Sequence, residues 1–177
     1  MKYVFGFLVF CSLFNLSLSA QSGSVLYYGN LNLQKYSGAA DVYDITMVHG
    51  LGYQFNNRMS AGAEVTFSGY KIANQKTKVF RLGPFYRYSI PLSNMFSIYG
   101  QIGAGWVKRK ASINDTGYYI NLFPAIYMKV YKGLGINFSM GEFNYSVLGG
   151  LKEIRVKYGD IPTLGLSLNI GGAITKE

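Results

Sequence analysis

Apolar and polar residues alternate with a period of two along most of the 177-residue chain. From Tyr43 to Phe55, every second residue is apolar or aromatic apart from one histidine, and the residues between them are mostly small or polar. The same alternation returns from Met59 to Phe67, after a short polar segment at 56–58. Successive side chains of a β-strand point to opposite faces, so this pattern predicts strands with one apolar and one polar face.

The alternation predicts about eight strands in all. Further strands are expected near 24–36, 78–90, 95–108, 117–130, 133–146 and 162–172. Short turns are expected at 56–58, 91–94 and 131–133, and longer loops near 37–41, 72–77, 109–116 and 147–161. Short turns at one end and longer loops at the other are typical of barrels in an outer membrane.

The composition favours a barrel in a membrane over one in water. Charged residues make up 14% of the chain, whereas an ordinary soluble domain has roughly 25%. The less apolar face of the strands consists mainly of Ser, Gly, Thr, Asn, Gln and Tyr, which suits a narrow interior filled by side chains. The 16 Tyr and 12 Phe are abundant enough to form girdles at the membrane interfaces. We therefore expect an all-β fold, a closed antiparallel up-and-down transmembrane β-barrel of about eight strands.

The first twenty residues have the layout of a secretory signal peptide. A lysine is followed by an apolar run at 3–14 and by small and polar residues up to Ala20. This run is shorter than the about 20 apolar residues that a transmembrane helix needs. We expect residues 1–20 to be cleaved and residues 21–177 to form the outer-membrane barrel domain. Cleavage would remove Cys11, the only cysteine, so neither a disulfide nor a Cys/His metal site is expected.

Three segments resemble the strand–turn–strand units of the OmpA-like and porin-like outer-membrane β-barrel families. They are GYQFNNRMSAG at 52–62, FYRY at 85–88 and FPAIY at 123–127. The resemblance extends over the whole mature chain. It implies a protein of the bacterial outer membrane, in contact with outer-membrane lipids and lipopolysaccharide.

Three charged residues fall on the predicted interior face of neighbouring strands: Glu64, Arg81 and Arg87. Charges inside a barrel must pair with one another or meet water. One interpretation is a gate or narrow pore whose ion pair rearranges. The alternative is a static polar network that fills the lumen.

A cluster of basic residues lies at the longer-loop end of the predicted barrel, in a chain whose formal net charge is +9. Its members are Lys71, Lys76, Lys78, Lys108, Arg109, Lys110, Lys152, Arg155 and Lys157. On the outside of a cell, such a cluster attracts anionic lipopolysaccharide, surface glycans or another envelope protein. The alternative is a solvated loop surface. No nucleic-acid-binding motif is present, so nucleic acid is not an expected partner.

His49 is the only histidine, and therefore the one candidate base for a barrel enzyme that acts on the acyl chains of lipid A or phospholipid. Such enzymes place a serine close to the histidine, whereas Gly50 and Leu51 follow here. We therefore expect no catalytic residue, no cofactor and no metal.

The favoured function is a non-enzymatic outer-membrane barrel with a structural, envelope or surface-interaction role and at most a narrow pore. The lipid-acyl enzyme is one alternative. A secreted soluble barrel of the lipocalin type, with an apolar ligand inside, is the other.

Overall fold

The computed structural model describes residues 23–36, 42–72, 75–111 and 114–170, and the predicted signal peptide lies outside these residues. The described part of the chain contains eight strands. They are β1 (Ser24–Tyr36), β2 (Val42–Gln54), β3 (Met59–Ile72), β4 (Gln75–Pro91), β5 (Phe96–Lys110), β6 (Asn114–Tyr131), β7 (Leu134–Leu148) and β8 (Leu151–Ile170). Within these ranges, no helix has the length and apolar character needed to cross a membrane.

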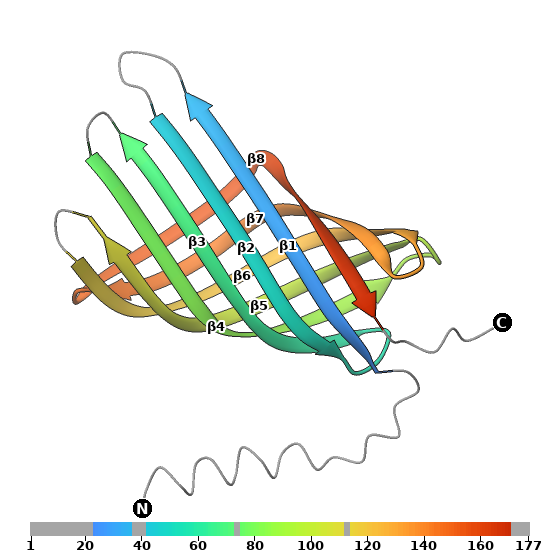
Figure 1. Cartoon of the computed structure of the whole chain (residues 1–177). Helices are drawn as coiled ribbons and strands as arrows, with labels where there is room; N and C mark the ends of the chain where they lie inside the picture. Colours follow the sequence, from blue (N-terminus) through green and yellow to red (C-terminus); the bar gives the residue numbers. More distant parts are fainter. Residues whose placement is uncertain (1–22, 37–41, 73–74, 112–113, 171–177) are drawn as a thin grey trace, which may run out of the picture.

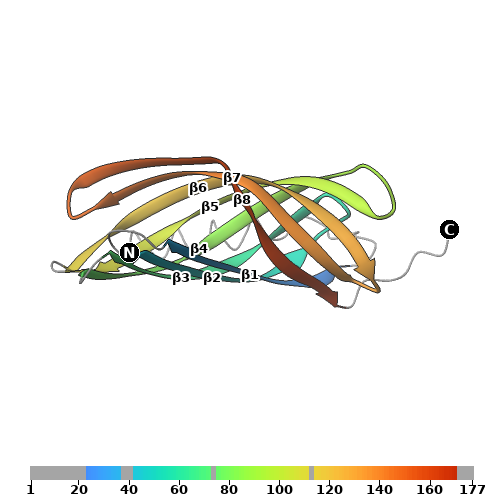
Figure 2. The same ribbon diagram turned by 90° about the horizontal axis from the view of Figure 1, so that it is seen from above.

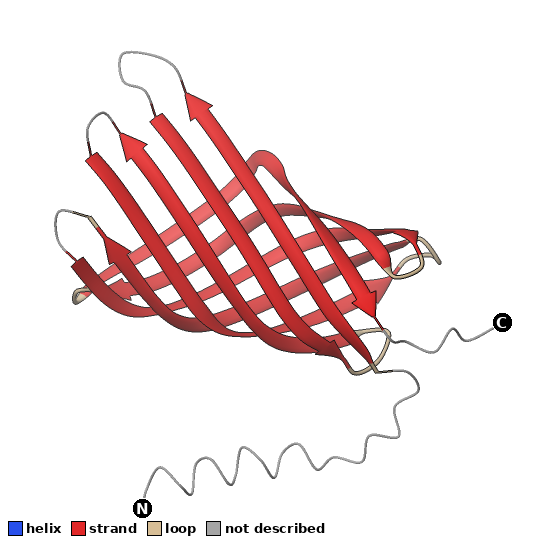
Figure 3. Cartoon of the chain, viewed as in Figure 1, coloured by secondary structure: helices blue, strands red, loops and turns tan. Residues whose placement is uncertain are grey.

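The strands form a closed barrel in chain order (Figure 1). Each strand pairs antiparallel with the next, and β8 pairs with β1 to complete the ring. The three turns β2–β3, β4–β5 and β6–β7 lie at one end, which we call the turn end, and the other four connections lie at the opposite loop end (Figure 3). Figure 2 shows the same strands from above. The predicted closed antiparallel barrel is confirmed.

The apolar face of the barrel points outward and the polar face points into the lumen. Leu33 and Leu51 on the outer face are 64% and 60% exposed, whereas Gln101 and Asn137 in the lumen are 1% and 2% exposed. Such a polarity is stable when the surrounding solvent is hydrocarbon. A soluble lipocalin-type barrel has the opposite polarity, so the structure disagrees with that alternative.

Aromatic residues mark the outer border of the apolar band. Phe67, Phe80 and Trp106, on β3, β4 and β5, form a row in which neighbouring ring centroids are 5.2 and 6.0 Å apart. On β5 the outward apolar residues begin at Phe96 and end at Trp106, which is roughly 33 Å along the strand. With a strand tilt of about 40° this corresponds to a height of about 25 Å, the usual height of the apolar band in such barrels.

The ladder that closes the barrel is shorter than the others. β1 pairs with β8 only over Val25–Asn30 and Gly165–Ile170, whereas it pairs with β2 along its whole length. Toward the loop end, β1 and β8 diverge (Figure 1). We call this unpaired stretch, which begins after Asn30 on β1 and at Leu164 on β8 and extends toward the loop end, the open seam.

The short turns lie where the sequence predicts them, whereas the long loops predicted at 72–77, 109–116 and 147–161 are wrong, and the loop predicted near 37–41 lies outside the described residues. The longest loop is expected at 147–161, but β7 and β8 are joined by Gly149 and Gly150 alone, and β8 begins at Leu151. Both glycines have positive φ, 57° and 83°, as in a tight two-residue hairpin turn. Strands also extend into the predicted loops at 72–77 and 109–116. The charged residues that follow β7 lie along β8, where alternate ones line the lumen.

Pro84 of β4, Pro124 of β6 and Pro162 of β8 lie inside strands, where a missing N–H interrupts the ladder. At Pro84 the pairing of β4 with β5 is interrupted without a change of register. Around Pro124 the register between β6 and β7 shifts, and β7 has a further shift against β8 between Ser139 and Gly141. Because of this irregularity, the buried positions of β7 change from odd to even residue numbers, and Glu142 lines the lumen.

The barrel wall is tight where glycines of β4 and β5 face each other. A Cβ on Gly83 would lie 2.0 Å from the carbonyl oxygen of Ala104. We expect Gly83→Ala to lower the free energy of unfolding by about 1–3 kcal/mol through overpacking. Urea unfolding in lipid vesicles, followed by the fluorescence of Trp106, measures this loss. Gly100→Ala is the matched control because no atom lies within 4 Å of a Cβ there; equal losses in both variants would contradict the prediction.

Candidate functional site

A group of buried side chains, which we call the plug, lies across the lumen, and all of its members except Tyr99 are linked by hydrogen bonds. It consists of Tyr28 on β1, Glu64 on β3, Arg87 on β4, and Tyr99 and Gln101 on β5. None of these residues is more than 5% exposed. The plug therefore occupies the cross-section that a pore through the barrel would need.

Gln101 is the central residue of the plug. Its side-chain oxygen accepts two hydrogen bonds from the Arg87 guanidinium, at 2.8 and 3.0 Å. Its side-chain nitrogen donates to the Tyr28 hydroxyl at 2.7 Å and to Glu64 Oε2 at 2.9 Å. The Tyr28 hydroxyl donates to the same carboxylate. The Arg87 guanidinium also lies 4.1 Å from the ring centroid of Tyr99. A neutral amide thus links a buried anion and a buried cation, and both charges are hydrogen-bonded.

The structure brings together two of the three charges that the sequence places inside the barrel. Glu64 and Arg87 share Gln101 in the plug. Arg81 lies nearer the loop end, where its Nη1 is 3.6 Å from Glu142 Oε1 and its Nη2 donates to Asn144 at 3.5 Å. Sequence reasoning missed Gln101, because an uncharged amide on the inward face of a strand gives no signal of its role.

A cavity of about 190 Å³ lies between the plug and the loop end. We call it the outer cavity. Its lining is mainly polar, with Asn, Ser and Thr side chains from several strands. The charged lining residues are Asp44, Glu64, Glu142, Glu153, Arg81, Arg109, Arg155 and Lys157. These acidic and basic residues are equal in number, so their formal charges cancel.

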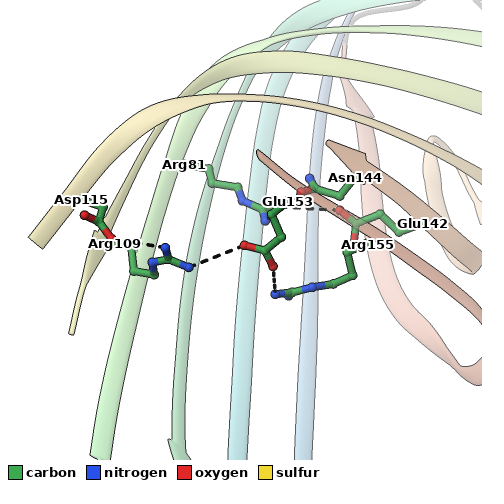
Figure 4. Close-up of polar contacts among 7 residues, drawn as sticks. All are labelled: Arg81, Arg109, Asp115, Glu142, Asn144, Glu153 and Arg155. Carbon is green, nitrogen blue, oxygen red and sulfur yellow. Dashed lines mark hydrogen bonds and ion pairs between the residues drawn. The ribbon is translucent and has the colours of Figure 1, made fainter. Parts of the chain in front are cut away.

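Ion pairs connect the strands around the outer cavity (Figure 4). The Arg109 guanidinium is 3.2 Å from Asp115 Oδ2 and 3.6 Å from Glu153 Oε2. Glu153 is in turn 2.6 Å from Arg155. These contacts tie β5 to β6 and β8, and the Arg81–Glu142 pair ties β4 to β7. A partly exposed ion pair contributes little by itself, so the outer cavity depends on the network as a whole.

The predicted external basic cluster is not one surface. Arg109, Arg155 and Lys157 line the outer cavity, so their placement on the outside is wrong. The remaining members of the cluster lie on the outward face. Of these, we call the five on β3, β4 and β5 the lysine belt: Lys71, Lys76, Lys78, Lys108 and Lys110. The sixth, Lys152, lies on β8.

The lysine belt contains two pairs of directly opposed cations. Lys71 faces Lys76 across the β3–β4 ladder, and Lys78 faces Lys110 across the β4–β5 ladder. Like charges directly opposite one another destabilise a sheet. On β5 the belt begins two residues beyond Trp106. The belt therefore lies just outside the aromatic border of the apolar band.

His49 lies on the outward face of β2. Its Nδ1 is 2.9 Å from the hydroxyl oxygen of Tyr27 on the neighbouring strand, and the two rings are stacked. No serine or carboxylate among the described residues has a hydrogen bond with His49. Within the described part of the chain, the hydroxyl next to the imidazole is that of Tyr27, and no serine nucleophile is hydrogen-bonded to it. The same described residues contain no group of three side chains suited to hold a metal ion.

The fold and the exposed apolar surface together define a bacterial outer-membrane β-barrel. Residues 5–174 match the family model of the outer membrane protein beta-barrel domain, and the chain belongs to this family. No curated protein matches the chain by sequence. The predicted family and the predicted location in the outer membrane are confirmed.

Solved outer-membrane barrels resemble the structure. The crystal structure of Neisserial surface protein A superimposes with a TM-score of 0.60, at 12% identity, over 82% of this chain and 96% of that chain. The Yersinia pestis outer membrane protein Ail, solved in a phospholipid nanodisc, gives a TM-score of 0.48 at 14% identity, over 84% of this chain and 99% of that chain. At such identities, the match to the Neisserial protein shows a common fold alone.

Replacing the central amide of the plug tests its role. We expect Gln101→Leu to lower the free energy of unfolding by about 3 kcal/mol, because it leaves the Glu64 carboxylate and the Arg87 guanidinium without their common partner. Urea unfolding in lipid vesicles measures the change. The control is Gln54→Leu at the turn end of β2, since that side chain has no hydrogen bond in the described part of the structure. An unchanged midpoint for Gln101→Leu would show that the plug is not held by this residue.

Proposed function

We propose that this outer-membrane barrel is a non-enzymatic envelope protein that binds lipopolysaccharide through the lysine belt. The observation that carries the proposal is the direct opposition of Lys71 to Lys76 and of Lys78 to Lys110. Opposed cations repel each other, and a phosphate group between them removes the repulsion. Lipopolysaccharide carries phosphate groups at the border between hydrocarbon and water.

The position of the lysine belt supports this ligand. The belt lies next to the aromatic row of Phe67, Phe80 and Trp106, at the loop end of the apolar band. Acyl chains of a lipid beside β3–β5 would contact the apolar band, while its phosphates would reach the lysines. Lysine presents a compact charge on a flexible stem, which suits contact with a phosphate at the membrane surface.

The charge distribution supports an outward-facing function. The charged residues that line the outer cavity cancel one another, so they add nothing to the formal net charge of +9. The lysine belt is therefore a major source of positive field near the outer surface. The plug fills the lumen, which argues against a general diffusion pore for solutes.

Removing the charges of the belt tests the proposal. We expect the variant with Lys71, Lys76, Lys78 and Lys110 each changed to Gln to bind phosphorylated lipid A roughly 1,000-fold more weakly, at about 1 kcal/mol per lysine. Titration of the barrel in nanodiscs with lipid A, followed by native mass spectrometry, measures the affinity. Wild-type affinity should also fall with rising salt.

Two comparisons make this test specific. Lys129→Gln with Lys132→Gln removes two lysines at the turn end and should leave lipid A affinity unchanged. Dephosphorylated lipid A should bind wild type and the four-lysine variant equally. If the wild-type barrel bound lipid A with and without phosphate equally well, the lysine belt would not be the binding site.

The proposal also predicts the absence of acyl-chain chemistry. His49 is hydrogen-bonded to Tyr27, and no serine among the described residues is hydrogen-bonded to it. We expect purified barrel in vesicles to release no fatty acid from lipid A or phospholipid over a day, as measured by mass spectrometry. Fatty-acid release that disappears in His49→Ala would favour the enzyme instead.

A further inference from the structure

We propose that the outer cavity binds a zwitterionic phospholipid, which enters sideways through the open seam. The β1–β8 ladder ends at Asn30 and Gly165, but the cavity continues toward the loop end. Both edges of the seam line it, through Asn32 on β1 and through Lys157 and Thr163 on β8. The cavity therefore adjoins the outer surface of the barrel between these two strands, at a site distinct from the lysine belt.

The outer side of the seam is apolar. Leu31 and Leu33 on β1 are 49% and 64% exposed, and Leu164 and Tyr158 on β8 are 55% and 90% exposed. Strand edges are unfavourable in hydrocarbon unless they adjoin a polar, water-filled space. The seam is thus a place where hydrocarbon lies directly beside a polar cavity. A molecule with an acyl chain outside and a polar headgroup inside fits both environments.

The charges around the cavity indicate the class of headgroup. Arg81, Arg109 and Arg155 each form an ion pair with a carboxylate. Lys157 on β8 and Asp44 on β2 also line the cavity, but neither forms an ion pair with a described residue. They lie on opposite sides of the seam, because β2 is the neighbour of β1. An ammonium and a carboxylate that have no ion-pair partner among the described residues match the phosphate and the ammonium of a zwitterionic headgroup.

Buried amides provide a second, independent observation. Asn121 and Asn144 line the outer cavity and are 5% and 4% exposed. Asn121 Oδ1, Asn144 Nδ2 and Asn30 Oδ1 have no hydrogen-bond partner among the described residues. Buried polar atoms require partners. The headgroup and the water that it brings would supply both donors and acceptors at these positions.

Closing the seam tests the route of entry. Leu31 and Leu164 stand immediately beyond the last pair of the ladder. In a Leu31→Cys, Leu164→Cys barrel, a short bifunctional methanethiosulfonate reagent would bridge the seam. We expect the bridged barrel to bind phosphatidylethanolamine about tenfold more weakly, a change of about 1.4 kcal/mol, in titrations read by native mass spectrometry. Reduction of the bridge should restore the affinity.

Val25→Cys with Ile170→Cys is the matched control, because these residues already pair in the ladder.

Separate variants test the headgroup. We expect Lys157→Gln and Asp44→Asn each to weaken binding of phosphatidylethanolamine about fivefold, as the loss of one charge contact near a membrane surface implies. Lys152→Gln, on the outward face of the same strand, should leave binding unchanged. Equal binding of phosphatidylglycerol, which lacks the ammonium group, would overturn the assignment of the headgroup. Unchanged binding after the seam is bridged would overturn the lateral route.

Discussion

The hydrocarbon core of a membrane offers no hydrogen bonds, so every backbone N–H and C=O of a spanning segment needs a partner within the protein. The eight strands meet this constraint by pairing in order and closing β8 onto β1. Closure places one face of every strand in lipid and the other in a narrow lumen. Polar side chains in so small a space must then satisfy one another. The plug around Gln101 is the result, with an amide between the Glu64 carboxylate and the Arg87 guanidinium.

The outer half of the β1–β8 contact is where this constraint is relaxed. β1 leaves β8 after Asn30, yet β8 continues to pair with β7 up to Leu151. Two features accompany the separation. The register shift of β7 near Gly141 turns Glu142 inward, and the Arg109–Glu153 pair ties the outer part of β8 across the lumen to β5. Polar groups inside the barrel thus stabilise strands that are not held by a complete ladder.

Much of the barrel follows from the sequence because alternation is a local property. Segments such as 59–67 show which residues face lipid, and Glu64 was correctly placed on the inward face. The outer half of β8 lies where the sequence predicts a long loop at 147–161, although Gly149 and Gly150 carry the signature of a tight hairpin. The open seam depends on the register between the first and last strands. Pairing over so long a distance has no local signal in the sequence.

The division of cations between the two faces follows from their chemistry. Among the described residues, the cations in the plug and the outer cavity are arginines apart from Lys157, and those of the lysine belt are all lysines. A planar guanidinium can contact two groups at once, as Arg109 and Arg81 do, and it is weakly hydrated, so it suits a crowded interior. A strongly hydrated ammonium suits the outer surface. Lys157 is the exception: it lies in the cavity beside the open seam, and among the described residues it has no ion-pair partner, whereas each cavity arginine has one. A lysine so placed gains a partner when an anionic group enters the cavity, which is the physical reason to regard the seam as an entrance and not as a defect in the barrel.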